Sequence, residues 1–390
     1  MTSSMITDYT PFLSARALNR KPSPIRELMK IMSPDMISLG GGLPNPATFP
    51  FKNISFELKT GESLSITGTD LQVALQYSQS YGIESFTKWL KEFQQNTHNL
   101  VDPTTPGRQW TVEVTNGSQE GLTEAIDTLL GEGDSVIVES PTYSGTLSIF
   151  NPIGVTLAGV PVDAHGIVPE QLEDLLANWD TRYAGKPKPK VLYTIPTGQN
   201  PSGCTMTVER KRSVYAICSN KVLSSGLRIG FVTGPAALVE KTQIMHQATS
   251  LHASGVSQMI AYTLLKAWGK EGFNKHVAYI QEFYRAKRDT FCECLDRYLG
   301  DMIEYNKPVA GMFVWIKVKG VNDTFSLIST KAIEKKVILT PGIAFSPDTS
   351  VPSTYVRASF STATTEQMDE ACKRFGELLK ENVHSSAVSK

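Results

Sequence analysis

The chain has 390 residues, 41% of them hydrophobic and 19% charged, which is the composition of a folded globular protein long enough for two domains. Lysine plus arginine and aspartate plus glutamate each number 38, so the balanced charge gives no support for a nucleic-acid or anionic membrane partner. No apolar run approaches the roughly 18 residues that a membrane-spanning helix needs, and the five scattered cysteines favour a reducing compartment.

Residues 1–45 contain several prolines and no clear periodicity, which predicts an irregular arm that wraps over the body of the protein. The arm begins with a stretch rich in serine and threonine that carries Arg16, Arg20 and Lys21 but only one acid, Asp8. This pattern faintly resembles a mitochondrial transit peptide. We expect the alternative, an ordinary polar arm and a cytoplasmic protein, with a mitochondrial location as the second option.

Residues 46–270 alternate between strand-like and helix-like patterns and form the predicted large domain. Apolar or alternating runs predict strands at 110–115, 135–139, 155–162 and 190–195. Amphipathic stretches predict helices at 118–130, 169–179 and 206–219. Such alternation is typical of an α/β fold, in which a mostly parallel sheet is covered by helices on both faces.

Residues 271–390 form the predicted smaller domain, of the α+β class. A long helix at 271–299 precedes two separate strands, at 311–318 and 355–361. In the last helix, Thr364 and Gln367 have the spacing of a capping box. Its predicted buried stripe consists of Met368, Ala371, Cys372, Phe375, Leu378 and Leu379.

A strand-to-helix turn with the sequence TNGSQEG (115–121) is the first candidate for chemistry. Gly117 allows a tight turn, and Ser118 and Gln119 begin the helix with free backbone N–H groups. These groups make a site suited to a phosphate. The alternative is an ordinary turn with a serine at the helix start.

Two further candidates follow predicted strands. Tyr143 lies in PTYSGT (141–146) and could stack on a flat ring, although a packed loop tyrosine is equally consistent with the pattern. Asn200 lies in YTIPTGQNPSG (193–203), where the carboxyl end of a parallel strand faces the ligand crevice. Its alternative is a polar turn residue.

Lys221 is the candidate nucleophile, and Arg228, seven residues later, offers a fork of donors for a phosphate. The alternative is a solvated lysine. A phosphate turn, a ring-stacking tyrosine, a crevice asparagine, a lysine and an arginine in this order on one parallel sheet are what a pyridoxal phosphate site requires. We predict no metal site, because the sequence has no HExxH motif and Cys292 and Cys294 form C-x-C rather than C-x-x-C.

Seven motifs in order resemble the fold-type I aminotransferases of class I/II. The likeness is strongest to the branch of kynurenine/2-aminoadipate aminotransferases and fungal aromatic amino-acid aminotransferases, and it runs from about residue 22 to about residue 382. The motifs are GGGLPNPATFPF, ALQYSQSYGI, TNGSQEGL, PTYSGT, YTIPTGQNPSG, KVLSSGLRIGF and YVRASFS.

The resemblance implies pyridoxal 5'-phosphate as cofactor and gives roles to individual residues. Lys221 is similar to the lysine that holds the cofactor as an imine, and then serves as general base and acid. Arg228, Ser118 and Gln119 resemble the phosphate contacts. Tyr143 resembles the tyrosine that stacks on the pyridine ring.

The same resemblance implies a substrate site and a homodimer. Asn200 is similar to the asparagine that bonds the ring's 3-oxygen and the substrate carboxylate, and Arg357 to the arginine that clamps the α-carboxylate. Tyr77 resembles a residue that reaches the phosphate of the neighbouring subunit. Arg26 resembles a mobile-arm arginine over the substrate, and Gly42 lies where the family's backbone approaches it.

The sequence departs from the family between Asn220 and Lys221. There the family has a strand with an acidic–Pro–Tyr motif, whose aspartate pairs with the pyridine nitrogen, and a further stretch before the lysine. About three to four dozen residues, two strands with their connections, are missing by this comparison. A skipped exon or a mispredicted gene is the cause that we favour over a natural variant without activity.

The expected function is the transfer of an amino group from kynurenine, 2-aminoadipate or aromatic amino acids to 2-oxoglutarate, with ping-pong kinetics. The alternatives are a truncated homologue with impaired or no activity and a related β-lyase with the same cofactor.

Overall fold

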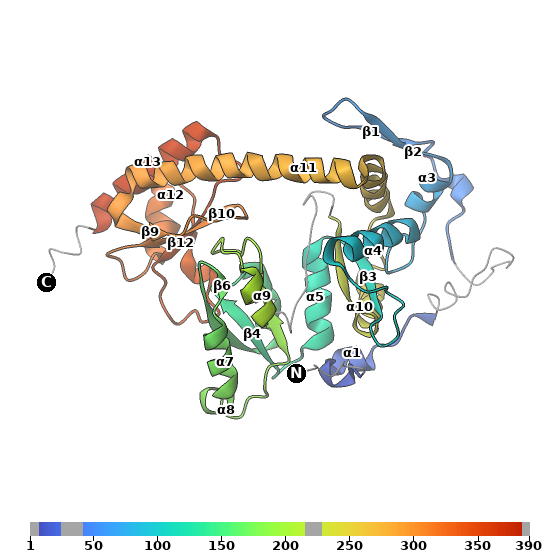
Figure 1. Ribbon diagram of the computed structural model, residues 1–390, viewed down its shortest axis with the longest axis horizontal. Coiled ribbons are helices and arrows are strands. Elements are labelled where there is room, and N and C mark those ends of the chain that lie inside the picture. Colours follow the sequence, from blue (N-terminus) through green and yellow to red (C-terminus); the bar gives the residue numbers. More distant parts are fainter. Residues whose placement is uncertain (1–7, 25–41, 215–227, 384–390) are drawn as a thin grey trace. The chain divides into compact units, whose positions relative to one another are not determined.

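The computed structural model describes residues 8–24, 42–214 and 228–383 (Figure 1). The chain divides into two compact units, and each is made of two stretches of sequence. Unit 1 comprises Met1–Gly131 and Ser219–Asn274, and unit 2 comprises Glu132–Cys218 and Lys275–Lys390. The predicted large domain, 46–270, contributes to both units, and its boundaries stay a prediction.

Unit 1 is built around a two-stranded antiparallel sheet, in which Trp110 of β3 lies opposite Pro235 of β8 and Thr115 opposite Gly230. Helices α5 and α10 pack on β3 and on each other. A separate hairpin pairs β1 with β2. The elements of the unit are α1 (Ala15–Asn19), β1 (Ile54–Glu57), β2 (Ser63–Ile66), α3 (Gly68–Leu75), α4 (Glu84–His98), β3 (Trp110–Thr115), α5 (Ser118–Leu129), β8 (Gly230–Pro235) and α10 (Ala236–Thr249).

Unit 2 contains two four-stranded sheets, with the strand orders β6-β5-β4-β7 and β11-β12-β10-β9. In the first, β4 is parallel to both β5 and β7, as an α/β fold requires. Its elements are β4 (Ser135–Ser140), α6 (Ser144–Ile153), β5 (Thr156–Asp163), β6 (Gly166–Ile167), α7 (Pro169–Ala177), α8 (Trp179–Arg182), β7 (Val191–Tyr193) and α9 (Val208–Val214).

The second sheet of unit 2 is antiparallel throughout. Its buried face and α13 enclose a core to which α11 also contributes, for example with Leu295 and Leu299. The elements of this part are β9 (Ile303–Tyr305), β10 (Phe313–Val318), α12 (Ala332–Glu334), β11 (Thr340–Pro341), β12 (Tyr355–Ser359) and α13 (Thr365–Val383). Helix α11 (Gly255–Tyr298) begins in unit 1 and ends in unit 2.

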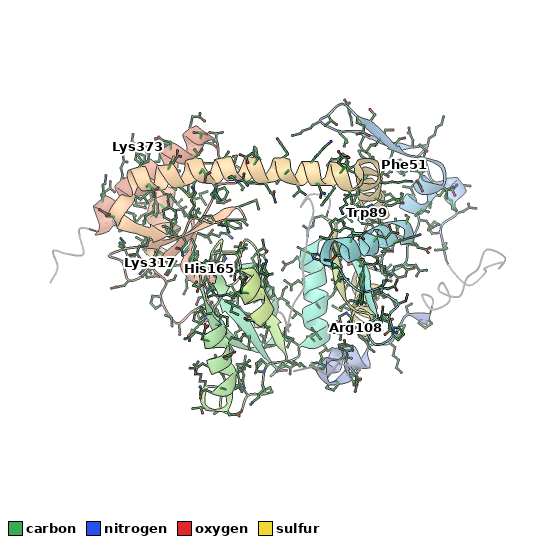
Figure 2. The ribbon with its side chains drawn as sticks, in the orientation of Figure 1. Phe51, Trp89, Arg108, His165, Lys317 and Lys373 are labelled. Carbon is green, nitrogen blue, oxygen red and sulfur yellow. The ribbon has the colours of Figure 1, made fainter. Side chains whose placement is uncertain are left out.

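Most predicted elements are confirmed within one or two residues. The capping box of α13 forms as predicted: the Thr364 N–H donates to Gln367 Oε1 at 2.9 Å and the Gln367 N–H to Thr364 Oγ1 at 3.2 Å. In the predicted stripe of α13, Ala371 is partly buried and the other five residues are fully buried, whereas Lys373 is exposed (Figure 2). The predicted helix at 206–219 is described as far as Val214, and the rest lies outside the described residues.

The long helix predicted at 271–299 matches the second part of α11, because non-helical backbone angles at Gly269 divide α11 into two helices. One expectation differs from the structure. The strand at 110–115 does not lie in one parallel sheet with β4, because it pairs antiparallel with β8. Among the described residues, no strand pairs with the second edge of β7 or with that of β8.

Candidate active site

The turn between β3 and α5 has the geometry of an anion site. Gly117 has a φ of 79° and a ψ of 166°, a conformation essentially restricted to glycine, and it precedes Ser118 at the first position of the helix. A Cβ atom at residue 117 would lie 2.8 Å from Nη2 of Arg228. The turn therefore brings the positive end of the helix dipole and a guanidinium to one place.

Side chains on both sides of the turn hold it in shape. The Asn116 backbone N–H donates to Glu120 Oε2 at 2.6 Å, and the Arg228 guanidinium donates to the Asn116 carbonyl at 3.3 Å. Ser250 also donates to Glu120. Burial opposes ionisation of Glu120, but the bonds from Ser250 and Asn116 hold the pKa of this carboxyl below its ordinary value. Glu120 thus stabilises the phosphate-type turn through its hydrogen bonds, a role that the sequence did not reveal.

Four other predicted residues belong to unit 1 or lie outside the described residues. Tyr77 is 48% exposed, and its ring makes an edge contact with His252 at 5.7 Å between centroids. Gly42 is exposed, with no atom within 4 Å of where a Cβ would lie. Lys221 and Arg26 lie outside the described residues, so their roles remain those that the resemblance implies.

In unit 2, Tyr143 lies between the end of β4 and the start of α6, where it precedes the first helical residue. A Cβ atom on Gly145 would lie 2.4 Å from the Tyr143 ring, so the ring lies directly over this glycine. A larger residue at position 145 would displace the tyrosine. The local sequence therefore fixes the ring that we predicted to stack on a cofactor.

Arg357 on β12 is the best-defined polar side chain of unit 2. Its Nη1 donates to Asn200 Oδ1 at 2.9 Å, and its Nη2 donates to Thr340 Oγ1 at 3.4 Å. The guanidinium carbon lies 4.2 Å from the centroid of Phe313 and 4.8 Å from that of Phe345. Burial lowers the pKa of Arg357, which nevertheless stays a cation at neutral pH.

Two of the predicted substrate residues, Asn200 and Arg357, thus meet in unit 2, and Arg357 is a partly buried side chain rather than half of a surface ion pair. No carboxylate of the described residues forms an ion pair with this guanidinium. Two aromatic rings and two neutral oxygen acceptors fix its position instead. A fixed, partly desolvated guanidinium without an internal carboxylate is suited to a carboxylate ligand.

Glu139 organises the loop that carries Asn200. This buried carboxylate at the end of β4 accepts hydrogen bonds from the Thr194 hydroxyl at 2.6 Å, the Ile195 N–H at 3.1 Å and the Gln199 amide at 3.0 Å. Burial raises the pKa of Glu139 to about 7, and the three bonds oppose that rise. Sequence reasoning missed this residue, because it lies inside an apolar strand and its partners are more than 50 positions away.

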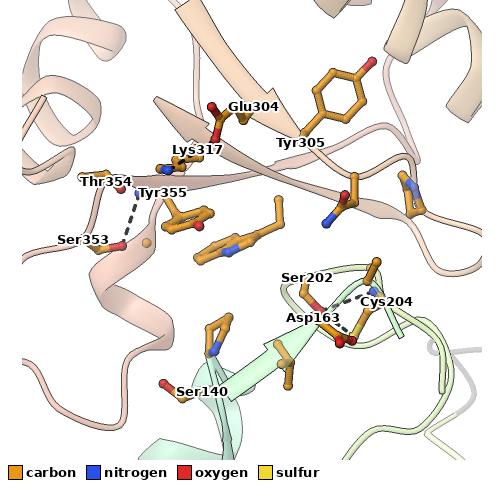
Figure 3. Close-up of a pocket in the computed structure, with 18 of the residues that line it drawn as sticks. Ser140, Asp163, Ser202, Cys204, Glu304, Tyr305, Lys317, Ser353, Thr354 and Tyr355 are labelled. Carbon is orange, nitrogen blue, oxygen red and sulfur yellow. Dashed lines mark hydrogen bonds and ion pairs between the residues drawn. The ribbon is translucent and has the colours of Figure 1, made fainter. Parts of the chain in front are cut away.

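A cavity of about 550 Å³ opens in unit 2 between the β10–β12 sheet and the carboxyl ends of β4 and β5 (Figure 3). Its aromatic wall is formed by Trp315 and Tyr355, whose rings stack at 5.2 Å. Lys317 and Glu304 form an ion pair of 3.3 Å at its edge. The residues that line this cavity do not include Tyr143, Asn200 or Arg357, so it is separate from the predicted substrate site.

A glycine-containing turn suited to an anion thus lies in one unit of this α/β protein, and an arginine–amide site suited to a carboxylate lies in the other. The sequence matches the model of the family aminotransferase class I and II over residues 69–224 and 218–375. The chain therefore belongs to this family and is an aminotransferase.

Relatives support the assignment over nearly the whole chain. Kynurenine/alpha-aminoadipate aminotransferase of Mus musculus is 38% identical over an alignment that covers 96% of this chain and 100% of that protein. An aromatic amino acid aminotransferase of Dictyostelium discoideum is 30% identical, with coverage of 99% and 90%. The kynurenine aminotransferase of Pyrococcus horikoshii is 29% identical, with a TM-score of 0.72 and coverage of 97% and 100%. Aminotransferase Aro8 of Candida albicans shares the fold, with a TM-score of 0.84, 24% identity and coverage of 98% and 100%.

The matches are interrupted where the sequence departs from the family. The two stretches that match the family model meet at residues 218–224, around Lys221. The alignment with the mouse protein has 424 positions, whereas 96% of 390 residues is about 374, so about 50 positions have no residue of this chain opposite them. None of the described helices is long and apolar enough to cross a membrane.

Proposed function

We propose that the chain uses pyridoxal 5'-phosphate to transfer an amino group from kynurenine, 2-aminoadipate or aromatic amino acids to 2-oxoglutarate. The observation that carries this proposal is the Arg357 site. Its guanidinium is held by Asn200, Thr340 and two aromatic rings, with no carboxylate partner among the described residues. Amino-acid and oxo-acid substrates share the α-carboxylate that such a site would bind.

The residues of unit 1 fit the phosphate of the proposed cofactor. Gly117 opens the turn, Ser118 and Gln119 supply N–H groups at the start of α5, and Arg228 supplies a cation beside the turn. When bound, pyridoxal phosphate withdraws electrons from the α-carbon of the amino acid and so acidifies its proton. Tyr143 would support the ring, and Asn200 would donate to the ring oxygen or to the substrate.

The proton transfers are assigned to Lys221. A primary amine next to cationic groups has a depressed pKa and can act as a base near neutrality. In the proposed reaction, the amine of Lys221 would take the α-proton of the amino acid and would later donate a proton as general acid. Arg357 would bind the α-carboxylate and so restrict the orientation of the amino acid.

The printed names of the relatives favour the proposed amino donors. The mouse relative is named for kynurenine and alpha-aminoadipate, and the Dictyostelium relative for aromatic amino acids. The Pyrococcus structure is described as a complex with PMP and with KYN as substrate. These donors share an α-carboxylate and differ in the side chain, so Arg357 would serve all of them.

The test is an assay of the purified 390-residue chain with pyridoxal phosphate, each candidate donor and 2-oxoglutarate. We expect glutamate and the matching 2-oxo acid in equal amounts, with parallel lines in double-reciprocal plots. Formation of ammonia from a cysteine conjugate without any oxo acid would instead indicate the β-lyase. Absence of glutamate with every donor, in protein that is folded and binds the cofactor, would contradict the proposal.

We also propose that the chain lacks a segment between α9 and β8 that its relatives possess. The interrupted family match and the unpaired edges of β7 and β8 among the described residues support this. The resemblance places there the acid that would keep the pyridine nitrogen protonated, so catalysis by this exact chain should be slow. Inserting the corresponding segment of the mouse relative should raise the turnover number by at least 10-fold, and an unchanged rate would contradict the proposed gap.

A homodimer is part of the proposal. Tyr77 is exposed in the single chain. We assign it to the phosphate of the cofactor in the partner subunit, a role that requires a dimer. Light scattering should give twice the chain mass of 42.8 kDa. A monomer that is fully active would contradict the role of Tyr77. Fluorescent fusions would decide between the proposed cytoplasmic location and a mitochondrial one, for which the name of the mouse relative is the argument.

A further inference from the structure

Below the phosphate-type turn of unit 1, two carboxylates and one imidazole converge in the protein interior. Glu113 comes from β3, Glu124 from α5 and His246 from α10. Their exposed fractions are 0%, 1% and 0%, and one ligand-type atom of each lies within 4.8 Å of the others. The aminotransferase reaction, as described above, has no use for these three side chains.

Both distances from His246 are close to those within a coordination sphere, and the carboxylate oxygens of Glu113 and Glu124 lie within 4.8 Å of each other. His246 Nδ1 lies 3.1 Å from Glu113 Oε1 and 3.6 Å from Glu124 Oε1. An ion about 2.1 Å from a nitrogen and from two oxygens, as Zn²⁺ is in proteins, separates its ligand atoms by about 3 to 3.5 Å. The three side chains therefore need little movement to share one ion.

Glu124 gives an independent sign of a missing ligand. Among the described residues, neither of its carboxylate oxygens has a hydrogen-bond partner, although both are buried. An unpaired carboxylate in this position is costly unless a positive charge joins it.

A second layer of side chains orients the three groups. Nδ1 of His246 lies at hydrogen-bond distance, 3.1 Å, from Glu113 Oε1, so metal binding at Nδ1 would place the imidazole proton on Nε2, which faces Glu120 Oε2 at 3.7 Å. Thr242 donates its hydroxyl to the other oxygen of Glu113. In metal sites, a ligating histidine usually hydrogen-bonds to a carboxylate, and a ligating carboxylate usually accepts a hydrogen bond from a group such as a hydroxyl.

We propose that Glu113, Glu124 and His246 bind one divalent transition-metal ion, Zn²⁺ or Mn²⁺. Two carboxylates and one imidazole suit these ions, and their combined charge with the ion is zero. The ion joins β3, α5 and α10, the three elements that carry or support the turn at Gly117. Its role is structural, and it takes no part in amino transfer.

The test measures bound metal and thermal unfolding of the full chain, neither of which depends on aminotransferase activity. Protein produced with Zn²⁺ and Mn²⁺ in the medium and then desalted should contain close to one ion per chain. EDTA should lower the unfolding midpoint, and either Zn²⁺ or Mn²⁺ should restore it. A metal content near zero, with a midpoint that neither EDTA nor added metal changes, would overturn the site.

Variants assign the metal to these residues. Glu124→Gln should abolish stoichiometric binding, and Thr242→Val should weaken it about 10-fold by releasing Glu113. Glu62→Gln, an exposed residue of the same unit, is the matched control and should bind as the wild type does. Unchanged binding in folded Glu124→Gln would also overturn the assignment, and if that variant does not fold, the wild-type metal content and Thr242→Val decide.

Discussion

The two candidate ligand sites, one in each unit, are built in different ways. The phosphate-type site of unit 1 relies on backbone, a glycine conformation and the start of a helix, with Arg228 beside it. The carboxylate site of unit 2 relies on side chains, because Arg357 is held by Asn200, Thr340 and aromatic rings. The site of unit 2 should therefore be sensitive to substitution of its individual side chains. The site of unit 1 should be sensitive mainly to substitution of its glycine.

The largest effect is expected from Arg357→Met. Loss of a desolvated, hydrogen-bonded charge typically costs about 2–5 kcal/mol, so kcat/KM for every amino donor should fall by about 30- to 5,000-fold. Cofactor affinity should change little. Steady-state kinetics and a cofactor titration measure both quantities.

Two further variants control for charge and for folding. Arg357→Lys keeps the charge but loses the two-pronged geometry, so it should recover only part of the activity. Lys317→Met, on the neighbouring strand, should behave like the wild type. Equal activity of Arg357→Met and wild type would show that another group binds the carboxylate.

An intermediate effect is expected in unit 1 from Gly117→Ala. The new Cβ would lie 2.8 Å from Arg228 Nη2. The alanine would also have to adopt a backbone conformation that costs about 1–3 kcal/mol. Because the turn would shift, affinity for pyridoxal phosphate should fall by about 10- to 100-fold. Ser118→Ala keeps the backbone N–H and should lower the affinity for pyridoxal phosphate only about 2- to 10-fold.

Gly61→Ala is the matched control for this comparison. Gly61 also has a positive φ, of 85°, but no atom lies within 4 Å of its Cβ position. The control should lose stability while keeping cofactor affinity. If Ser118→Ala lowered the affinity for pyridoxal phosphate more than Gly117→Ala, the site of unit 1 would depend on side chains as that of unit 2 does.

The smallest effect concerns pH and the loop that carries Asn200. Burial raises the pKa of Glu139 from 4.5 to about 7, so between these values the folded chain holds a proton that the unfolded chain has released. The resulting stabilisation is complete below pH 4.5 and is lost as pH rises to about 7. The slope is at most about 1.4 kcal/mol per pH unit.

Denaturant titrations across this pH range should show that slope in the wild type and lose it in Glu139→Gln. Glu173→Gln, an exposed substitution in the same unit, should retain it. A wild-type stability that rises between pH 4.5 and 7 relative to Glu139→Gln would contradict the raised pKa.

Local patterns predicted most of the fold, because periodicity and capping depend on neighbouring residues. The strands at β3 and β4 and the capping box of α13 are examples. Strand partners could not be predicted, since the pairing of β3 with β8 joins residues more than 110 positions apart. The part of α11 before Gly269 was not predicted, whereas the part after it matches the helix predicted at 271–299.

The same distinction holds for the candidate site. The sequence predicted Arg357, Asn200 and Tyr143 through the family resemblance, and the first two meet in unit 2. It did not predict Glu139 or Glu120, whose importance comes from partners brought near by folding. Nor did it predict the group of Glu113, Glu124 and His246, whose members have no motif spacing.

The most direct test of the central claim is the visible spectrum of this exact chain with pyridoxal phosphate, before and after kynurenine is added. We expect a bound-cofactor band that bleaches with kynurenine and returns with 2-oxoglutarate, even if slowly. A band that forms in folded protein and does not respond to any amino acid would contradict the claim that this chain is an active aminotransferase.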